Sequence, residues 1–118
     1  MRRYSDTSKV VSGEATALNA LYRDVTSYPE PIRTELQGQL RDYTRYVIDD
    51  AWPLQRRGKV PGGGIERMTR FQSVLDKFEP VTEGQKFLHG ETLRAYNLLI
   101  QSRRLRLDAV GTGLPNVM

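Results

Sequence analysis

The chain of 118 residues contains no cysteine and only one histidine, His89. The absence of cysteine excludes a disulfide framework, a thiolate nucleophile and a thiolate metal site. It leaves the compartment open, because a protein without cysteine is stable in either redox environment. A single histidine excludes a two-histidine metal site. The residue three positions earlier is Lys86, where the di-iron motif of helical bundles has glutamate, so the sequence predicts no metal.

Long hydrophobic runs are also missing from the chain. No stretch reaches the roughly 18 consecutive apolar residues that are typical of a transmembrane helix. No apolar segment follows the first basic residues, so the start of the chain does not resemble a signal peptide. The net charge is +4, from 18 basic and 14 acidic residues. The two signs are interspersed over most of the chain, which is typical of solvent-exposed helix faces.

Apolar residues recur at helical spacing in four segments, over about residues 9–26, 31–52, 65–79 and 83–110. The first three segments each carry an apolar stripe: Val11, Ala15, Leu18, Tyr22 and Val25; Ile32, Leu36, Leu40, Tyr43, Val47 and Ala51; and Ile65, Met68, Phe71, Val74, Leu75 and Phe78. The sequence therefore predicts a single all-α domain over residues 1–118, an uneven four-helix up-down-up-down bundle. In this topology the start of the first helix and the end of the fourth lie at one end.

The segment 83–110 is apolar over most of its helical circumference, which predicts a long central helix with neighbours on several sides. We expect Leu98 and Ile100 to lie in the core. Thr82 and Gln85 have the spacing of a capping box at the start of this helix. Its end is marked by Gly111, Gly113 and Pro115. In the second segment, Pro53 is expected to end or kink the helix near residues 51–52.

Residue patterns for catalysis are weak. Asp49 and Asp50 are adjacent, so on a helix they point in different directions and do not form a catalytic dyad. We expect them to pair with Arg45 or Arg56. His89 shares an apolar sector with residues at helical spacing, which favours a partly buried, hydrogen-bonded side chain. No serine or threonine has a base pattern beside it. The sequence predicts neither an enzyme nor a cofactor.

Two groups of residues are candidates for binding. Tyr43, Tyr46 and Trp52 form a candidate interaction surface, although a sole tryptophan more commonly anchors a core. A candidate membrane-proximal basic cluster contains Arg2, Arg3, Arg103, Arg104 and Arg106. Compensation of the helix dipole is the simpler role for the last three of these. Nucleic acid is not an expected partner, because the basic excess is small and no helix-turn-helix signature is present.

Three segments together resemble a bestrophin-like family of bacterial membrane proteins of unknown function. They are ALNALYRDV, YPEPIRTELQGQLRDYTRYVIDDAWPLQRRG and FEPVTEGQKFLHGETLRAYNLLIQSRRLRLDAVGTGLP, with residues 43–53 and 103–115 the most specific. In that family such a segment lies between two hydrophobic hairpins, and the chain enters a membrane span after Gly-Leu-Pro. The resemblance implies the soluble domain of a four-span protein, tethered by flanking transmembrane helices. The resemblance does not indicate any catalytic residue in this chain.

Two classes of function stay open. The first is a structural or regulatory domain of a channel- or transporter-like protein of the bacterial inner membrane. The terminal arginines would then place the domain on the cytoplasmic side, and the apolar surface left over by a short third helix predicts a homo-oligomer. The second is a stand-alone helical module that binds a ligand or nucleic acid.

Overall fold

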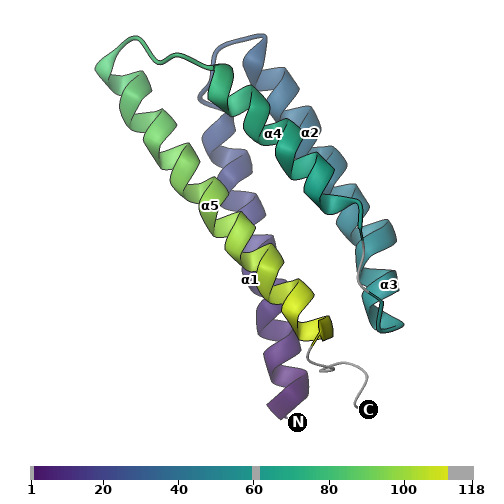
Figure 1. The fold of residues 1–118 in the computed structure, drawn as a ribbon. Helices are drawn as coiled ribbons and strands as arrows, with labels where there is room; N and C mark the ends of the chain where they lie inside the picture. Colours follow the sequence, from purple (N-terminus) through teal and green to yellow (C-terminus); the bar gives the residue numbers. More distant parts are fainter. Residues whose placement is uncertain (1, 60–61, 112–118) are drawn as a thin grey trace.

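The computed structural model describes residues 2–59 and 62–111, and the side chains of residues 12–59 and 62–108. Its elements are α1 (Arg2–Val25), α2 (Ile32–Tyr46), the π-helical turn η1 (Val47–Ala51), α3 (Trp52–Arg56), α4 (Gly64–Lys77) and α5 (Glu83–Gly111). No strand occurs in the described ranges. Because α2, η1 and α3 continue one another, the chain makes four antiparallel helical segments (Figure 1). The predicted all-α bundle with a long C-terminal helix is confirmed.

The two ends of the bundle have different connections (Figure 1). We call the end that carries the start of α1 and the end of α5 the terminal end; α3 lies there too. The opposite, closed end holds the α1–α2 turn and the α4–α5 connection. The predicted placement of both helix termini at one end is therefore observed.

Local sequence signals explain several helix boundaries. At the start of α5, the backbone N–H of Gln85 donates to the Thr82 hydroxyl at 3.0 Å, and the Gln85 side-chain oxygen accepts from the backbone N–H of Thr82 at 3.4 Å and from that of Val81 at 2.8 Å. This reciprocal arrangement is the predicted capping box. Gly113 and Pro115, the predicted end signals, lie outside the described residues. At the other terminus, α1 begins at Arg2, seven residues before the expected start.

The turn η1 shows how the second helical segment passes Pro53 without ending. A proline lacks the N–H of an α-helical bond, and its ring clashes with the carbonyl of the residue four positions earlier, here Asp49. The wider π turn over Val47–Ala51 relieves this clash, and α3 continues to Arg56. The expected kink near residues 51–52 therefore takes the form of a π turn.

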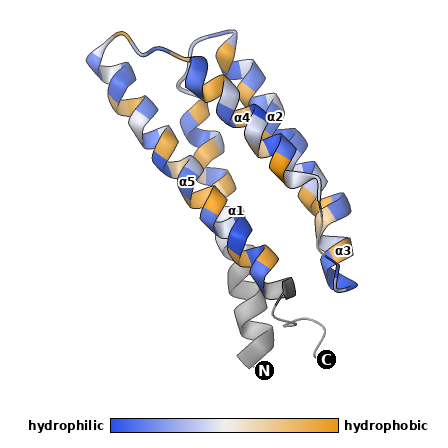
Figure 2. Cartoon of the chain, in the orientation of Figure 1, coloured by the Kyte–Doolittle hydropathy of each residue, from blue (hydrophilic) through white to orange (hydrophobic). Residues whose placement is uncertain are grey.

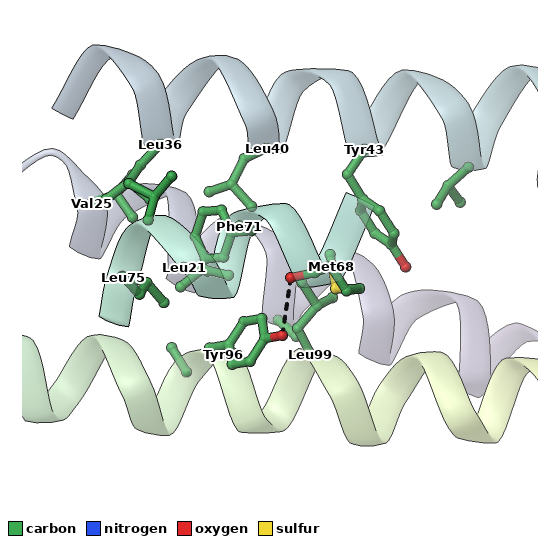
Figure 3. Close-up of a cluster of buried hydrophobic side chains, with 14 of the residues drawn as sticks. Leu21, Val25, Leu36, Leu40, Tyr43, Met68, Phe71, Leu75, Tyr96 and Leu99 are labelled. Atoms are coloured by element: carbon green, nitrogen blue, oxygen red, sulfur yellow. Dashed lines mark hydrogen bonds between the residues drawn. The ribbon is translucent and has the colours of Figure 1, made fainter. Parts of the chain in front are cut away.

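The core lies where α1, α2, α4 and α5 meet (Figure 3). Phe71 of α4 stacks on Tyr96 of α5 with ring centroids 5.7 Å apart. The Tyr96 hydroxyl donates to the Met68 carbonyl at 3.2 Å, so the buried phenol keeps a partner. The largest fully buried apolar side chains come from all four helical segments: Leu21 and Val25 of α1; Leu36, Leu40 and Tyr43 of α2 with Val47 of η1; Met68, Phe71 and Leu75 of α4; and Leu99 of α5. The stripes predicted for the second and third segments mostly supply this core, although Ile65 is 55% exposed.

The buried face of α1 is rotated from the predicted one. The buried residues are Glu14, Ala17, Leu21 and Val25, whereas Ala15 is exposed and Leu18 and Tyr22 are half-buried. The side chain of Val11 lies outside the described residues. The predicted stripe passes through Leu18 and Tyr22, and it omits both Leu21 and a glutamate that is 1% exposed. A buried carboxylate carries no hydrophobic signal, so the apolar pattern alone misplaced this face.

The expectation that Leu98 lies in the core is wrong, because the long last helix is covered on one side only. One face of α5 is buried through Thr92, Ala95, Tyr96 and Leu99, but the opposite face is open. Phe87 is 67% exposed, Leu98 52% and Leu105 58%. Ile100 is half-buried. The helix packs mainly along α1 and lies at the side of the bundle, so only one of its two apolar stripes finds a neighbour.

Hydrophobic and hydrophilic residues alternate along every coloured helix (Figure 2). Among residues 2–59 and 62–111, no helix is both long enough and apolar enough to cross a membrane.

Candidate functional site

A network of polar side chains is buried at the terminal end of the bundle, and it joins four helical elements. Arg106 of α5 donates from Nε to Glu14 Oε1 at 2.5 Å and from Nη2 to Glu14 Oε2 at 3.2 Å. Tyr43 of α2 donates its hydroxyl to Glu14 Oε2 at 2.8 Å. Gln55 of α3 accepts from Arg106 Nη1, and its amide donates to the Arg106 carbonyl at 3.2 Å. The side chains of Arg106 and Glu14 are 3% and 1% exposed.

The charges in this network compensate one another. Burial alone would lower the pKa of Arg106, but the hydrogen bond and the negative charge of Glu14 raise it above its ordinary value. Burial raises the pKa of the Tyr43 phenol far above 10, and the nearby Glu14 carboxylate raises it further. Both groups therefore keep their protons at neutral pH. The network is a fixed ion pair with a neutral phenol and an amide around it.

This network has the character of a structural link. Every charged atom faces a partner of the protein, so no side chain is left to act as a nucleophile or as a base on a substrate. Sequence reasoning missed Glu14 and Gln55 because they lie 92 and 51 positions from Arg106. One signal was available: Glu14 precedes Leu18 and Leu21 by four and seven positions, the spacing of a core-facing residue.

The structure separates the predicted basic cluster. Arg106 is committed to Glu14 and is not accessible from solvent. Arg103 is half-buried beside Gly64, where an added Cβ would lie 2.9 Å from the arginine Nε. Arg104 is exposed. The side chains of Arg2 and Arg3 lie outside the described residues.

The predicted aromatic surface is largely part of the core. Tyr43 is fully buried, and Tyr46 is 9% exposed. The Tyr46 hydroxyl accepts from the Gly63 N–H at 2.9 Å, and the guanidinium of Arg67 lies 4.4 Å from its ring centroid. Trp52 is half-buried against the core, and its indole nitrogen is buried without a hydrogen-bond partner. Of the three residues, only Trp52 reaches an open face of the bundle.

Trp52 lines a groove of about 180 Å³ between α1 and the α2–η1 segment. Leu18 and Tyr22 of α1 and Ile48 of η1 form much of its wall. Leu18 and Tyr22 belong to the predicted α1 stripe, so this part of the stripe faces the groove at the edge of the core, whereas Val25 of the same stripe is fully buried. The walls are mainly apolar, and the Glu14 carboxylate at its inner side is already bound by Arg106 and Tyr43.

The closed end is held by aromatic rings. The Tyr28 hydroxyl and His89 Nδ1 are hydrogen-bonded at 2.6 Å, and both rings contact Phe78. Burial lowers the pKa of His89, and the charge of Asp76 opposes this by raising it. The prediction of a partly buried, hydrogen-bonded histidine is observed.

The two adjacent aspartates take part in neither the buried polar network nor the aromatic cluster. Asp49 and Asp50 are exposed on η1, and none of the ion pairs in the described part of the chain involves them. The expected pairing with Arg45 or Arg56 is not observed. The same part of the chain contains no cluster of three or more histidine, aspartate or glutamate residues that could hold a metal ion.

Comparison with known proteins supports one relationship. A family model described as the Bestrophin-like domain matches residues 1–118, and this match suggests a membrane-associated protein. No curated protein and no solved structure matches the chain. Because the family match covers the entire chain, the protein belongs to the Bestrophin-like domain family.

Proposed function

We propose that this chain is a non-catalytic helical domain of a bacterial inner-membrane protein, inserted between two membrane spans and facing the cytoplasm. The observation that carries the proposal is the placement of the start of α1 and the end of α5 at one end of the bundle (Figure 1). A domain inserted between adjacent spans must receive and return the chain on the side that faces the bilayer. The Bestrophin-like match supplies the link to a membrane.

The role that this arrangement supports is structural or regulatory, in a protein of the channel or transporter type. The buried network fastens α5 to α1 through Arg106 and Glu14. A change in the position of either flanking span would therefore be transmitted to both helices. The orientation toward the cytoplasm is supported by Arg104 and by Arg2 and Arg3 in the sequence, since basic residues near spans favour that side.

Reporter fusions in the full-length protein test this topology. Alkaline phosphatase or a fluorescent protein is inserted between Glu79 and Pro80, in the closed-end connection and outside the Thr82–Gln85 capping box. Fluorescence without phosphatase activity is the expected result. Phosphatase activity without fluorescence would place the domain outside the cytoplasm. Steeply salt-dependent binding of the isolated chain to duplex DNA would favour a nucleic-acid-binding module instead.

We also propose that the domain self-associates through the open face of α5. Phe87, Leu98 and Leu105 lie on one side of this helix, along roughly 27 Å of its length at 1.5 Å per residue. Exposed apolar side chains along one side of a helix favour an interaction site. A second copy of the chain fits this requirement because a symmetric contact pairs the stripe with itself.

Sedimentation of the chain over a range of concentrations tests this contact. The wild type is expected to associate, and a variant with serine at residues 87, 98 and 105 is expected to stay monomeric. A control variant with serine at two exposed apolar positions outside α5, Ile65 of α4 and Val81 of the α4–α5 connection, should associate as the wild type does. A strict monomer at high concentration would contradict the proposal.

A further inference from the structure

The tip of α3 carries three exposed basic residues on a rigid turn. Arg56 ends the helix, and Arg57 and Lys59 follow in the turn. The Gly58 N–H donates to the Gln55 carbonyl at 2.9 Å, and the Lys59 N–H donates to the Leu54 carbonyl at 3.0 Å. With Gly58 at φ 77°, these two bonds form a Schellman motif. The backbone that presents the three charges is therefore fixed.

These three side chains are free of acidic partners. All are exposed, and none takes part in the ion pairs found among the described residues. Basic residues at a helix C-terminus always gain some dipole compensation. That role requires one or two charges in the last turn, and it does not require Lys59, which lies beyond the helix end. The tip presents more positive charge than its helix needs.

The tip lies as far along the bundle as the start of α1. Tyr43 and Glu14 are hydrogen-bonded, so they lie at about the same height along the bundle axis and serve as a common reference point. From this level, α1 runs back to Arg2 over roughly 18 Å, and the α2–η1–α3 segment runs to Arg56 over roughly 20 Å, at 1.5 Å per residue. Figure 1 shows both at the terminal end of the bundle.

The position of the tip is tied to the helices that carry the termini. Gln55, one residue before Arg56, binds both the side chain and the backbone carbonyl of Arg106. Arg106 in turn binds Glu14 of α1. Any surface that receives the ends of α1 and α5 will therefore meet the α3 tip at a set distance.

The closed end has the opposite charge balance. Six acidic residues lie around its two connections, against four basic ones: Asp24, Glu30, Glu35, Asp76, Glu79 and Glu83 against Arg23, Arg33, Lys77 and Lys86. The bundle is thus polarised along its axis. A negatively charged plane attracts the terminal end and repels the closed end.

We propose that Arg56, Arg57 and Lys59 dock on the anionic headgroups of the bilayer to which this domain is tethered. The inference rests on the proposed insertion between membrane spans and adds a specific contact surface to it. A bilayer is favoured over nucleic acid because the three charges share one end with both helix termini. Basic residues at an anionic bilayer each strengthen binding by roughly fivefold, and the effect decays within a Debye length.

Vesicle cosedimentation tests this contact with the chain at low ionic strength. The vesicles contain phosphatidylcholine alone or phosphatidylcholine mixed with phosphatidylglycerol. The wild type is expected to bind only the mixed vesicles. The triple variant Arg56→Gln, Arg57→Gln, Lys59→Gln should bind them on the order of a hundredfold more weakly. Its circular dichroism and melting temperature should match the wild type, because these side chains make no ion pair in the described part of the chain.

A control variant separates the tip from total charge. Arg23→Gln, Lys77→Gln and Lys86→Gln remove the same charge from the closed end, where a weaker loss is expected. Equal losses in the two variants, absence of wild-type binding to mixed vesicles, or tighter binding to duplex DNA at the same salt would each overturn the inference. Cytoplasmic fluorescence in the reporter fusion together with any of these results would leave the topology standing and reject only the lipid contact.

Discussion

The two ends of the bundle are closed by different chemistry. At the terminal end, an ion pair of Arg106 and Glu14 is buried with a phenol and an amide around it. At the closed end, Tyr28, Phe78 and His89 pack as rings with one hydrogen bond. Removing one partner of a buried ion pair leaves the other charge buried and unpaired, which strongly lowers the free energy of unfolding. Removing one ring from an aromatic contact lowers it less. The terminal end should therefore be fragile to single substitutions, and the closed end should respond to acid.

The largest effect is expected from Arg106→Leu. This change leaves the Glu14 carboxylate buried without its cation, which should lower the free energy of unfolding by about 3–5 kcal/mol. Urea unfolding followed by circular dichroism measures the loss. The double variant Glu14→Leu, Arg106→Leu is the control, and it should recover most of the stability because no charge stays buried. A loss below about 1 kcal/mol in the single variant would show that water reaches the pair.

A smaller effect is expected at the closed end from Tyr28→Phe. The ring keeps its edge contact with Phe78, but His89 loses its partner at 2.6 Å. The free energy of unfolding should fall by about 1 kcal/mol. Tyr22→Phe is the matched control: its hydroxyl accepts an exposed bond from Arg41 at 2.8 Å, so its removal should cost less. Equal costs would show that the Tyr28 bond has no special role at this end.

The closed end should also weaken in mild acid. Burial holds the pKa of His89 below its ordinary value, with Asp76 opposing the shift. The unfolded chain therefore binds a proton more readily, and stability is lost as the pH falls below about 6.5. Melting temperatures measured between about pH 8 and pH 5 should show this decline. His89→Gln should flatten it in that range, and an unchanged slope in this variant would assign the decline to other groups.

The smallest effect is expected on the open face of α5. Leu98 is 52% exposed, so Leu98→Asp should change the free energy of unfolding by no more than about 0.5 kcal/mol at a low protein concentration. Leu99→Asp, one position along on the buried face, should cost several times more, because it buries an unpaired charge. Similar losses in both variants would mean that the outer stripe is covered in solution.

Helical periodicity was sufficient to predict the order of the helices, and it failed where polar residues are buried. The stripe on α2 was predicted correctly because Leu36, Leu40 and Tyr43 are all apolar and lie at regular spacing. On α1, the core position of Glu14 depends on Arg106, which lies 92 residues away. No local pattern contains that information. The same limit applies to α5, which has two apolar stripes. Only contact with α1, far away in the sequence, decides which of the two stripes is buried.

The candidate site was less predictable than the fold. Sequence clustering grouped Arg103, Arg104 and Arg106 together, although a helix sends neighbouring residues to different faces and only Arg104 is exposed. The sequence indicates for Arg56 only an ion pair with a nearby aspartate. The place of Arg56 with Lys59 at the terminal end depends on how far the α2–η1–α3 segment continues beyond Tyr43, which the spacing of apolar residues does not reveal.

The π turn over Val47–Ala51 has a consequence for sequence variation among relatives. A π turn holds one residue more than the α turn that it replaces, so it shifts the phase of every later position in the segment by about 100°. Gln55 meets Arg106 in this shifted phase. A relative that has lost one residue between Val47 and Trp52 would turn the amide position away from its arginine. We therefore expect a single-residue deletion here to be accompanied by loss of the amide at position 55 or by its transfer to a neighbouring position.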